Sequence, residues 1–149
     1  MDNHFAAGSL IAERLKAEMP GARVLVVATV KAAMDLGQAA PAVFVIPDID
    51  AEVERDGASW DGVASFFDQR WLVVVAVRNV QDVANGEAAV NEAGATVTGV
   101  LKALSGWTPS AEHGPLRRAT AARLAYQAGF GWVPLAFDTR IFTEGSVNE

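Results

Sequence analysis

The chain has 149 residues, which matches one ordinary domain that is large enough to bury a hydrophobic core without disulfides or metals. It contains no cysteine, so disulfides, thiolate metal sites and cysteine nucleophiles are excluded, and a reducing cytoplasm is the natural setting. Its formal net charge of −6 argues against broad nucleic-acid binding, which needs a basic face, and no apolar run approaches the ~20 residues that span a bilayer.

An amphipathic helix is expected first, over residues 4–19. Ile11, Leu15 and Met19 fall on one stripe of this segment, and Pro20-Gly21 ends the pattern. The first residues carry neither a basic leader nor a long apolar stretch, so we expect no secretory signal.

Two short strands are expected next, over residues 23–30 and 42–47. Both runs are rich in β-branched residues and almost wholly apolar, which is typical of strands that are covered on two faces. The stretch 31–38 between them looks helical and bounds the first strand. Residues 48–62 are acidic and rich in turn formers, so they predict an exposed loop or hairpin arm.

The strongest strand pattern covers residues 65–79 and predicts a strand in the centre of the sheet. Its apolar side chains alternate between two faces, with Trp71, Val73, Val75 and Val77 on one face and Leu72, Val74 and Ala76 on the other. Helical spacing then recurs from about residue 86 to residue 104, although Gly94 and Gly99 weaken it.

The C-terminal third favours a hairpin of two long strands, over residues 116–129 and 131–144. Gly129 and Gly131 mark its turn, and Pro134 is expected to break the second strand. The first of the two segments also fits a helix, so the hairpin is a preference rather than a requirement of the pattern.

The resulting element order is α-β-β-β-α-β-β. It predicts an α+β fold, a mainly antiparallel sheet with two helices packed on one face. We expect residues 1–149 to form a single domain, with a polar C-terminal tail from about residue 144.

No catalytic signature is present in the sequence. It contains no GxSxG elbow, P-loop or GxGxxG fingerprint, and its serines lie in helix or turn contexts where no histidine is expected nearby. His4 and His113 are too far apart in sequence to form a spaced metal pair. We therefore expect no catalytic residue, no metal site and no cofactor, and the chain is predicted not to be an enzyme.

Alternating carboxylates mark the acidic segment. Asp48, Asp50, Glu52 and Glu54 fall on one face if the chain is extended there. Several carboxylates can bind calcium, but the spacing is not that of an EF-hand loop. A solvated acidic face is the simpler interpretation, and a docking surface for a basic partner is the sharper one.

Three tryptophans, Trp60, Trp107 and Trp132, fall in glycine-rich connections. Large apolar side chains in such places either fold back as plugs or contact another chain. Gly106 and Pro109 are sufficient to stop the second helix. We expect Trp107 to fold back and lock this helix end against the sheet, and a contact role is the alternative.

Taken together, these elements resemble the tail terminator, or tail completion, proteins of long-tailed bacteriophages and prophages, particularly the branch found in Mu-like phages. The resemblance covers about residues 5–143. It rests on the N-terminal helix, on the strands "PAVFVIPD" and "QRWLVVVAVRN", and above all on the helix end "VLKALSGWTP" followed by the C-terminal strands.

The resemblance implies a structural protein of the phage particle. Such a protein assembles as a hexameric ring on the end of the tail tube, stops tube polymerisation and provides the head-joining surface. The implied partners are copies of itself, the tail-tube protein and a head-completion or connector protein. The implied locations are the host cytoplasm during assembly and then the virion tail.

A ring needs two different patches that meet head to tail, and such patches favour aromatic and arginine anchors. The candidate subunit-interface residues are Trp60, Arg70, Arg78, Trp132 and Arg140, with Asp48, Asp50, Glu52 and Glu54 of a neighbour supplying complementary charge.

Two alternatives stay open at this point. One is another structural role, as a head–tail connector or a component of a contractile injection system. The other is a small-molecule-binding α+β domain that uses Tyr126, His113 and the acidic segment. A deep pocket that gathers these side chains would favour the second alternative.

Overall fold

A six-stranded sheet forms the centre of the molecule, which a computed structural model describes over residues 3–36, 42–52, 64–78, 86–120, 125–127 and 130–144. The strands are β1 (Arg23–Val26), β2 (Ala42–Glu52), β3 (Ala64–Arg78), β4 (Arg117–Ala119), β5 (Ala125–Gln127) and β6 (Phe130–Glu144). They lie in the order β1-β2-β3-β6-β4, and β5 also pairs with β6. Of the described pairs, β1–β2 alone is parallel, so the predicted mainly antiparallel sheet and its central strand β3 are confirmed.

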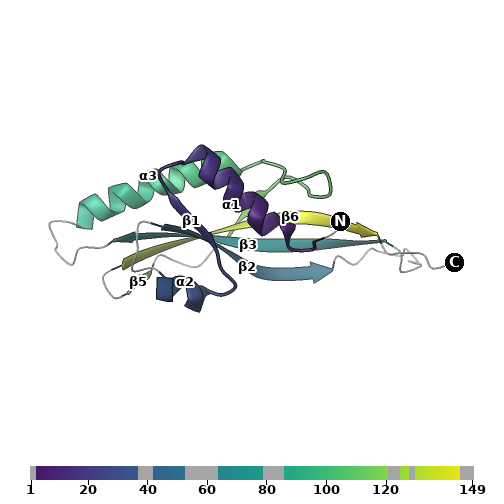
Figure 1. The fold of residues 1–149 in the computed structure, drawn as a ribbon, viewed down its shortest axis with the longest axis horizontal. Coiled ribbons are helices and arrows are strands. Elements are labelled where there is room, and N and C mark those ends of the chain that lie inside the picture. Colours follow the sequence, from purple (N-terminus) through teal and green to yellow (C-terminus); the bar gives the residue numbers. More distant parts are fainter. Residues whose placement is uncertain are drawn as a thin grey trace.

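Among the described residues, three helices pack on this sheet: α1 (Ala6–Glu18), α2 (Val30–Leu36) and α3 (Gly86–Leu104). Figure 1 shows α1 and α3 on one face of the sheet and α2 on the other. The predicted layer of two helices on one face is confirmed, and the bounds predicted for α3 agree with those observed.

The predicted element order is wrong in omitting α2. Helix α2 begins after Thr29, whose hydroxyl accepts a hydrogen bond from the Ala32 amide at 3.1 Å and caps the helix. The first strand therefore ends at Val26, where a strand through residue 30 was expected. The observed order is α-β-α-β-β-α-β-β-β.

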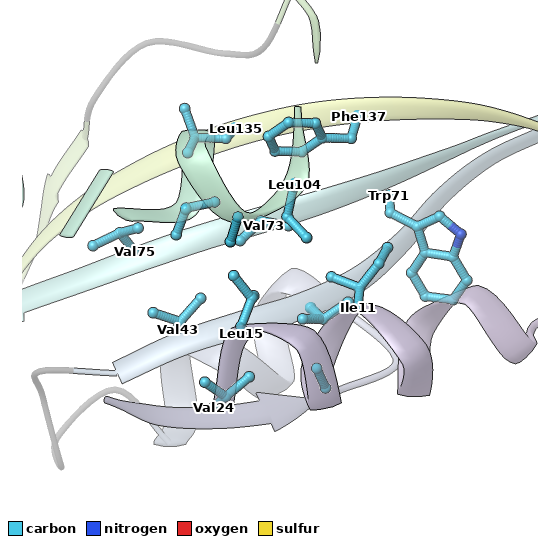
Figure 2. Close-up of a cluster of buried hydrophobic side chains, with 14 of the residues drawn as sticks. Ile11, Leu15, Val24, Val43, Trp71, Val73, Val75, Leu104, Leu135 and Phe137 are labelled. Atoms are coloured by element: carbon cyan, nitrogen blue, oxygen red, sulfur yellow. The ribbon is translucent and has the colours of Figure 1, made fainter. Parts of the chain in front are cut away.

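The main core lies between the sheet and the helix pair α1 and α3. Figure 2 shows Ile11 and Leu15 of α1 and Leu104 of α3 pointing toward sheet residues that include Val73 and Phe137. All five of these side chains have no solvent-exposed area. The predicted alternation along β3 is confirmed, because Trp71, Val73, Val75 and Val77 all belong to this core cluster.

Helix α1 approaches the sheet closely at Gly8. A Cβ atom added at this glycine would lie 2.7 Å from two ring carbons of Trp71, which is inside van der Waals contact. The glycine is therefore what allows the indole of Trp71 to fill the space under the first turns of α1.

A second apolar cluster occupies the opposite face, at the end of the sheet where α2 packs. Its buried members are Ala33, Ala42, Phe44, Ile46, Val74, Ala76 and Trp132. Their strand positions alternate with those of the main core, so this part of the sheet is apolar on both faces.

Strand β2 is longer than predicted. The acidic residues 48–52, expected in a loop or hairpin arm, continue the strand and pair with β3, with Asp50 opposite Gln69. An irregularity between Pro47 and Asp50 inserts one extra residue on β2. The remainder of the predicted arm, residues 53–62, lies outside the described residues.

The preferred C-terminal hairpin is confirmed for the described residues. Gln127 of β5 pairs with Phe130 of β6, and β4 is also a strand. The expected break at Pro134 is wrong, because β6 continues through it. Pro134 lies between the part of β6 that pairs with β5 and the part that pairs with β4, a place that tolerates a missing N–H. The predicted tail begins at the end of β6, and residues 145–149 lie outside the described residues.

Candidate interaction surfaces

A bare, charged stretch of the sheet lies on the face away from α1 and α3. We call it the charged face. Figure 1 shows β2, β3 and β6 extending past α2, and none of the described helices covers this side of their extension. The charged face consists of Phe66, Asp68 and Arg70 of β3 and Asp138, Arg140 and Phe142 of β6, flanked by Asp48 of β2 and Arg117 of β4.

Register places opposite charges directly across from each other on this face. The Arg70 guanidinium donates two hydrogen bonds to the Asp138 carboxylate, at 2.7 and 3.1 Å. The Arg140 guanidinium does the same to Asp68, at 2.9 and 3.1 Å. Beyond these pairs, the rings of Phe66 and Phe142 are 5.3 Å apart. The bidentate geometry fixes all four charged side chains along the strands.

The charges on this face also shift one another's pKa values. Hydrogen bonding to Arg140 lowers the pKa of Asp68, and the charges of Arg140 and Arg117 add to the shift. Hydrogen bonding to Asp138 raises the pKa of Arg70, and the charges of Asp138 and Asp48 act in the same direction. Asp68 and Arg70 are therefore ionised near neutral pH.

On the helix side, a chain of hydrogen bonds ties the start of α1 to the sheet. The Trp71 indole N–H donates to the Gln69 side-chain oxygen at 2.7 Å, and the Gln69 amide donates to the His4 carbonyl at 3.2 Å. The His4 ring lies 2.7 Å from a carboxylate oxygen of Asp50. Gln69 is only 1% exposed, so these bonds satisfy a polar group within the core.

The end of α3 carries the glycine and tryptophan that the sequence singled out. Gly106 has a φ of +77°, the left-handed conformation that ends helices. Trp107 is half-buried against the main core, with the Arg14 guanidinium 5.6 Å above its ring. The Trp107 carbonyl accepts a hydrogen bond from the Leu116 amide at 2.9 Å. The indole is thus folded back, and half-buried Pro109 follows two residues later.

The loop after Pro109 contains a contact that the sequence analysis missed. Ser110 was expected to have no histidine nearby, but its hydroxyl lies 2.6 Å from His113 Nδ1, because a turn closed by the hydrogen bond from the His113 amide to the Ser110 carbonyl brings them together. The same hydroxyl donates to Glu112 at 2.9 Å. Burial lowers the pKa of His113 despite the opposing charge of Glu112.

Two surface hollows among the described residues do not gather polar groups for chemistry. One lies between α3 and strands β4 and β6, with Val97, Arg118, Thr120 and Leu135 in its lining, and another lies between α1, α3 and β2. His113 lines neither hollow, and the Tyr126 side chain lies outside the described residues. Across the part of the chain that the structure describes, no cluster suited to a metal ion occurs, and no helix is long and apolar enough to cross a membrane.

The predicted interface residues lie in different surroundings. Arg70 and Arg140 pair with aspartates of their own chain. Trp132 is 8% exposed and packs beside Phe44, with 6.1 Å between ring centroids, so it presents little surface to a neighbour.

The structure describes the side chains of only some of the other predicted interface residues. Asp48 is exposed beside Arg70, and Asp50 contacts His4. Arg78 ends β3 and Glu52 ends β2, with side chains outside the description. Trp60 and Glu54 lie outside the described residues.

The sequence does contain a signal for the pairs that were missed. Positions 66, 68 and 70 read Phe, Asp and Arg, and positions 142, 140 and 138 read Phe, Arg and Asp in the reverse direction. Two segments with period-two spacing and matching charges predict an antiparallel pair with acids opposite bases.

Comparisons with known proteins found a matching family and a similar solved structure. A family model described as phage tail terminator protein matches residues 1–146. Among solved structures, a chain from the virion of a native gene transfer agent particle is similar, with a TM-score of 0.52 and 17% sequence identity over 94% of this chain and 99% of that chain. A search of curated protein sequences finds no match.

Proposed function

Because the chain belongs to the phage tail terminator family and is therefore a structural protein of the phage tail, we propose that it assembles as a hexameric ring on the end of the tail tube. The ring stops tube polymerisation and provides the surface to which the head is joined. The observation that carries this proposal is the family match, which covers residues 1–146. The partners are six copies of the chain, the tail-tube protein and a head-completion or connector protein.

The two outer strands support a head-to-tail ring. In the described part of the sheet, β1 forms one edge and β4 the other. Strand β1 has the sequence RVLV with Val26 49% exposed, whereas β4 has the sequence RRA. Rings close through two different patches on each subunit. The two edge strands differ in sequence and in charge.

The small-molecule alternative receives no support from the described surface. It requires His113 to converge with other polar groups in a pocket, but the His113 ring is turned into its own loop toward Ser110. A role without catalysis is consistent with a surface on which ionised side chains are paired with each other rather than directed into a cleft.

The proposal is tested by adding purified protein to polymerising tail-tube protein and imaging the products by electron microscopy. We expect shorter tubes, each with a cap on one end, and native mass spectrometry of the caps should give six copies. Tubes of unchanged length without end density would contradict the proposal. Binding to head portals but not to tube ends would instead identify a connector.

A further inference from the structure

The charged face has an internal symmetry in its charges. Across the strands from β2 to β4, one row reads Asp48, Arg70, Asp138 and Arg117. The next row reads Asp68 and Arg140, and the third reads Phe66 and Phe142. Exchanging the two sides of a line midway between β3 and β6 replaces every acid by a base and every base by an acid. It also replaces the Phe66 ring by the Phe142 ring.

This symmetry makes the face complementary to itself. Consider a second copy laid face to face on the first and related to it by a two-fold axis parallel to the strands, midway between β3 and β6. The axis places β3 over β6 of the partner subunit, so Asp68 faces Arg140 of the partner subunit and Arg70 faces Asp138 of the partner subunit. Phe66 faces Phe142 of the partner subunit in the same way. Face-to-face sheets with nearly aligned strands are a common packing.

We propose that the charged face is a self-association surface that joins two free copies of this chain in a two-fold dimer. The proposal is independent of the ring, because it concerns the chain before it meets the tube. The contact is of the isologous kind, in which each pairing occurs twice. Its partner is a second copy because this arrangement gives every one of the six charges an opposite charge and brings the phenylalanine rings together.

The side chains of this face are accessible to a second copy. Asp68 and Arg140 are each 51% exposed, and Phe142 is 40% exposed. The ion pairs set the orientation of the two copies more than the affinity, since each charge already has a partner in its own chain. The eight side chains of the face are fewer than the roughly 20–30 residues per side of a stable interface. We therefore expect a weak dimer that forms at micromolar concentrations or above.

Charge reversal at one pair tests the proposal. Asp68→Arg places a new arginine against Arg140 of the partner subunit, twice per dimer, and should raise the dimer dissociation constant by about tenfold or more. The double variant Asp68→Arg/Arg140→Asp exchanges the two charges and restores both the pair within the chain and the facing pair. It should dimerise like the original protein. Sedimentation equilibrium over a wide concentration range measures all three proteins, and circular dichroism checks that each is folded.

Mixing separates self-association from a merely structural role of these residues. A fluorescently labelled double variant, titrated with the unlabelled original protein, should pair at least about tenfold more weakly than with unlabelled copies of itself, because its charges then face like charges. Equal pairing in both titrations would overturn the proposal, and so would an original protein that stays monomeric at every concentration. A single reversal that leaves the free protein unchanged but abolishes tube capping would overturn it too, and would assign the face to the tube.

Discussion

The two halves of β3 belong to one strand but differ in what covers them. From Trp71 to Val77 the strand is buried on both faces, by α1 and α3 on one side and by the α2 cluster on the other. From Phe66 to Arg70 one face meets the start of α1, and the other is the bare charged face. Burial of the covered half stabilises the fold, whereas the side chains of the bare face are accessible to a partner.

The largest difference in stability is expected when one aromatic ring is removed from the covered part of the sheet and one from the bare part. Trp71→Ala should lower the free energy of unfolding by about 3–5 kcal/mol, because it empties the space between α1 and the sheet. Phe142→Ala, on β6 opposite Phe66 of the bare half, should change it by no more than about 1 kcal/mol. Urea unfolding followed by circular dichroism measures both, and similar losses would show that the bare half also holds the fold.

A matched pair of glycine substitutions tests how tightly α1 covers the sheet. Gly8→Ala should destabilise the protein by about 1–3 kcal/mol, because the added methyl group overlaps the Trp71 ring. Gly94→Ala, in α3, meets nothing within 4 Å and should stabilise the protein by about 0.5–1 kcal/mol through helix propensity. The same urea experiment measures both changes. A neutral or stabilising effect at Gly8 would mean that α1 is less closely packed than described.

The pH dependence of stability should report the buried histidine of the loop after α3. Since burial lowers the pKa of His113 in the folded state, the unfolded chain binds a proton more readily, and stability falls as the pH drops through the ordinary histidine range. Between pH 7.5 and pH 5 the original protein should lose more stability than His113→Gln. Urea midpoints measured at several pH values test this, and parallel curves for the two proteins would contradict it.

The smallest effect is expected on the charged face. Hydrogen bonding to Arg140 lowers the pKa of Asp68, so the pair contributes stability above the ordinary carboxyl pKa and loses it as the pH falls through the lowered value. Because both side chains are half exposed, Asp68→Asn should leave the urea midpoint at pH 7 within experimental error. The measurement is made on dilute protein, where any dimer has dissociated. A clear loss would show that the bare half stabilises the fold.

Most of the covered half could be predicted from the sequence. Apolar residues repeat every three to four positions in α3, whereas β3 is apolar at every position from Trp71 to Val77, as expected of a strand that is covered on both faces. Helix α2 was left out of the predicted order, although its stretch looked helical, because it has only seven residues and Val27 to Thr29, between it and β1, were assigned to the first strand. The end of β2 was missed because acidic residues favour loops, although they lie in a strand with one exposed face.

Much less of the bare half could be predicted. Arg70 and Arg140 each pair with an aspartate of their own chain, and their contacts with acids of a neighbour stay a prediction. Partners of this kind depend on the register between β3 and β6, which long-range pairing sets. The reversed Phe, Asp and Arg spacing in the two strands was the available signal. The interface roles of the other candidate residues, Trp60 and Glu54 among them, also stay predictions.

The position of β6 in the sheet decides when the molecule can finish folding. This strand follows every other described element along the chain, yet it lies between β3 and β4, and it joins Arg70 to Asp138 across 68 residues. Pairing over such distances is slow, because a long loop must close first. While the ribosome is still making the chain, β3 lacks its neighbour on one side and shows an apolar edge to other chains. Until β6 emerges, this edge of β3 stays open to strand pairing with other chains.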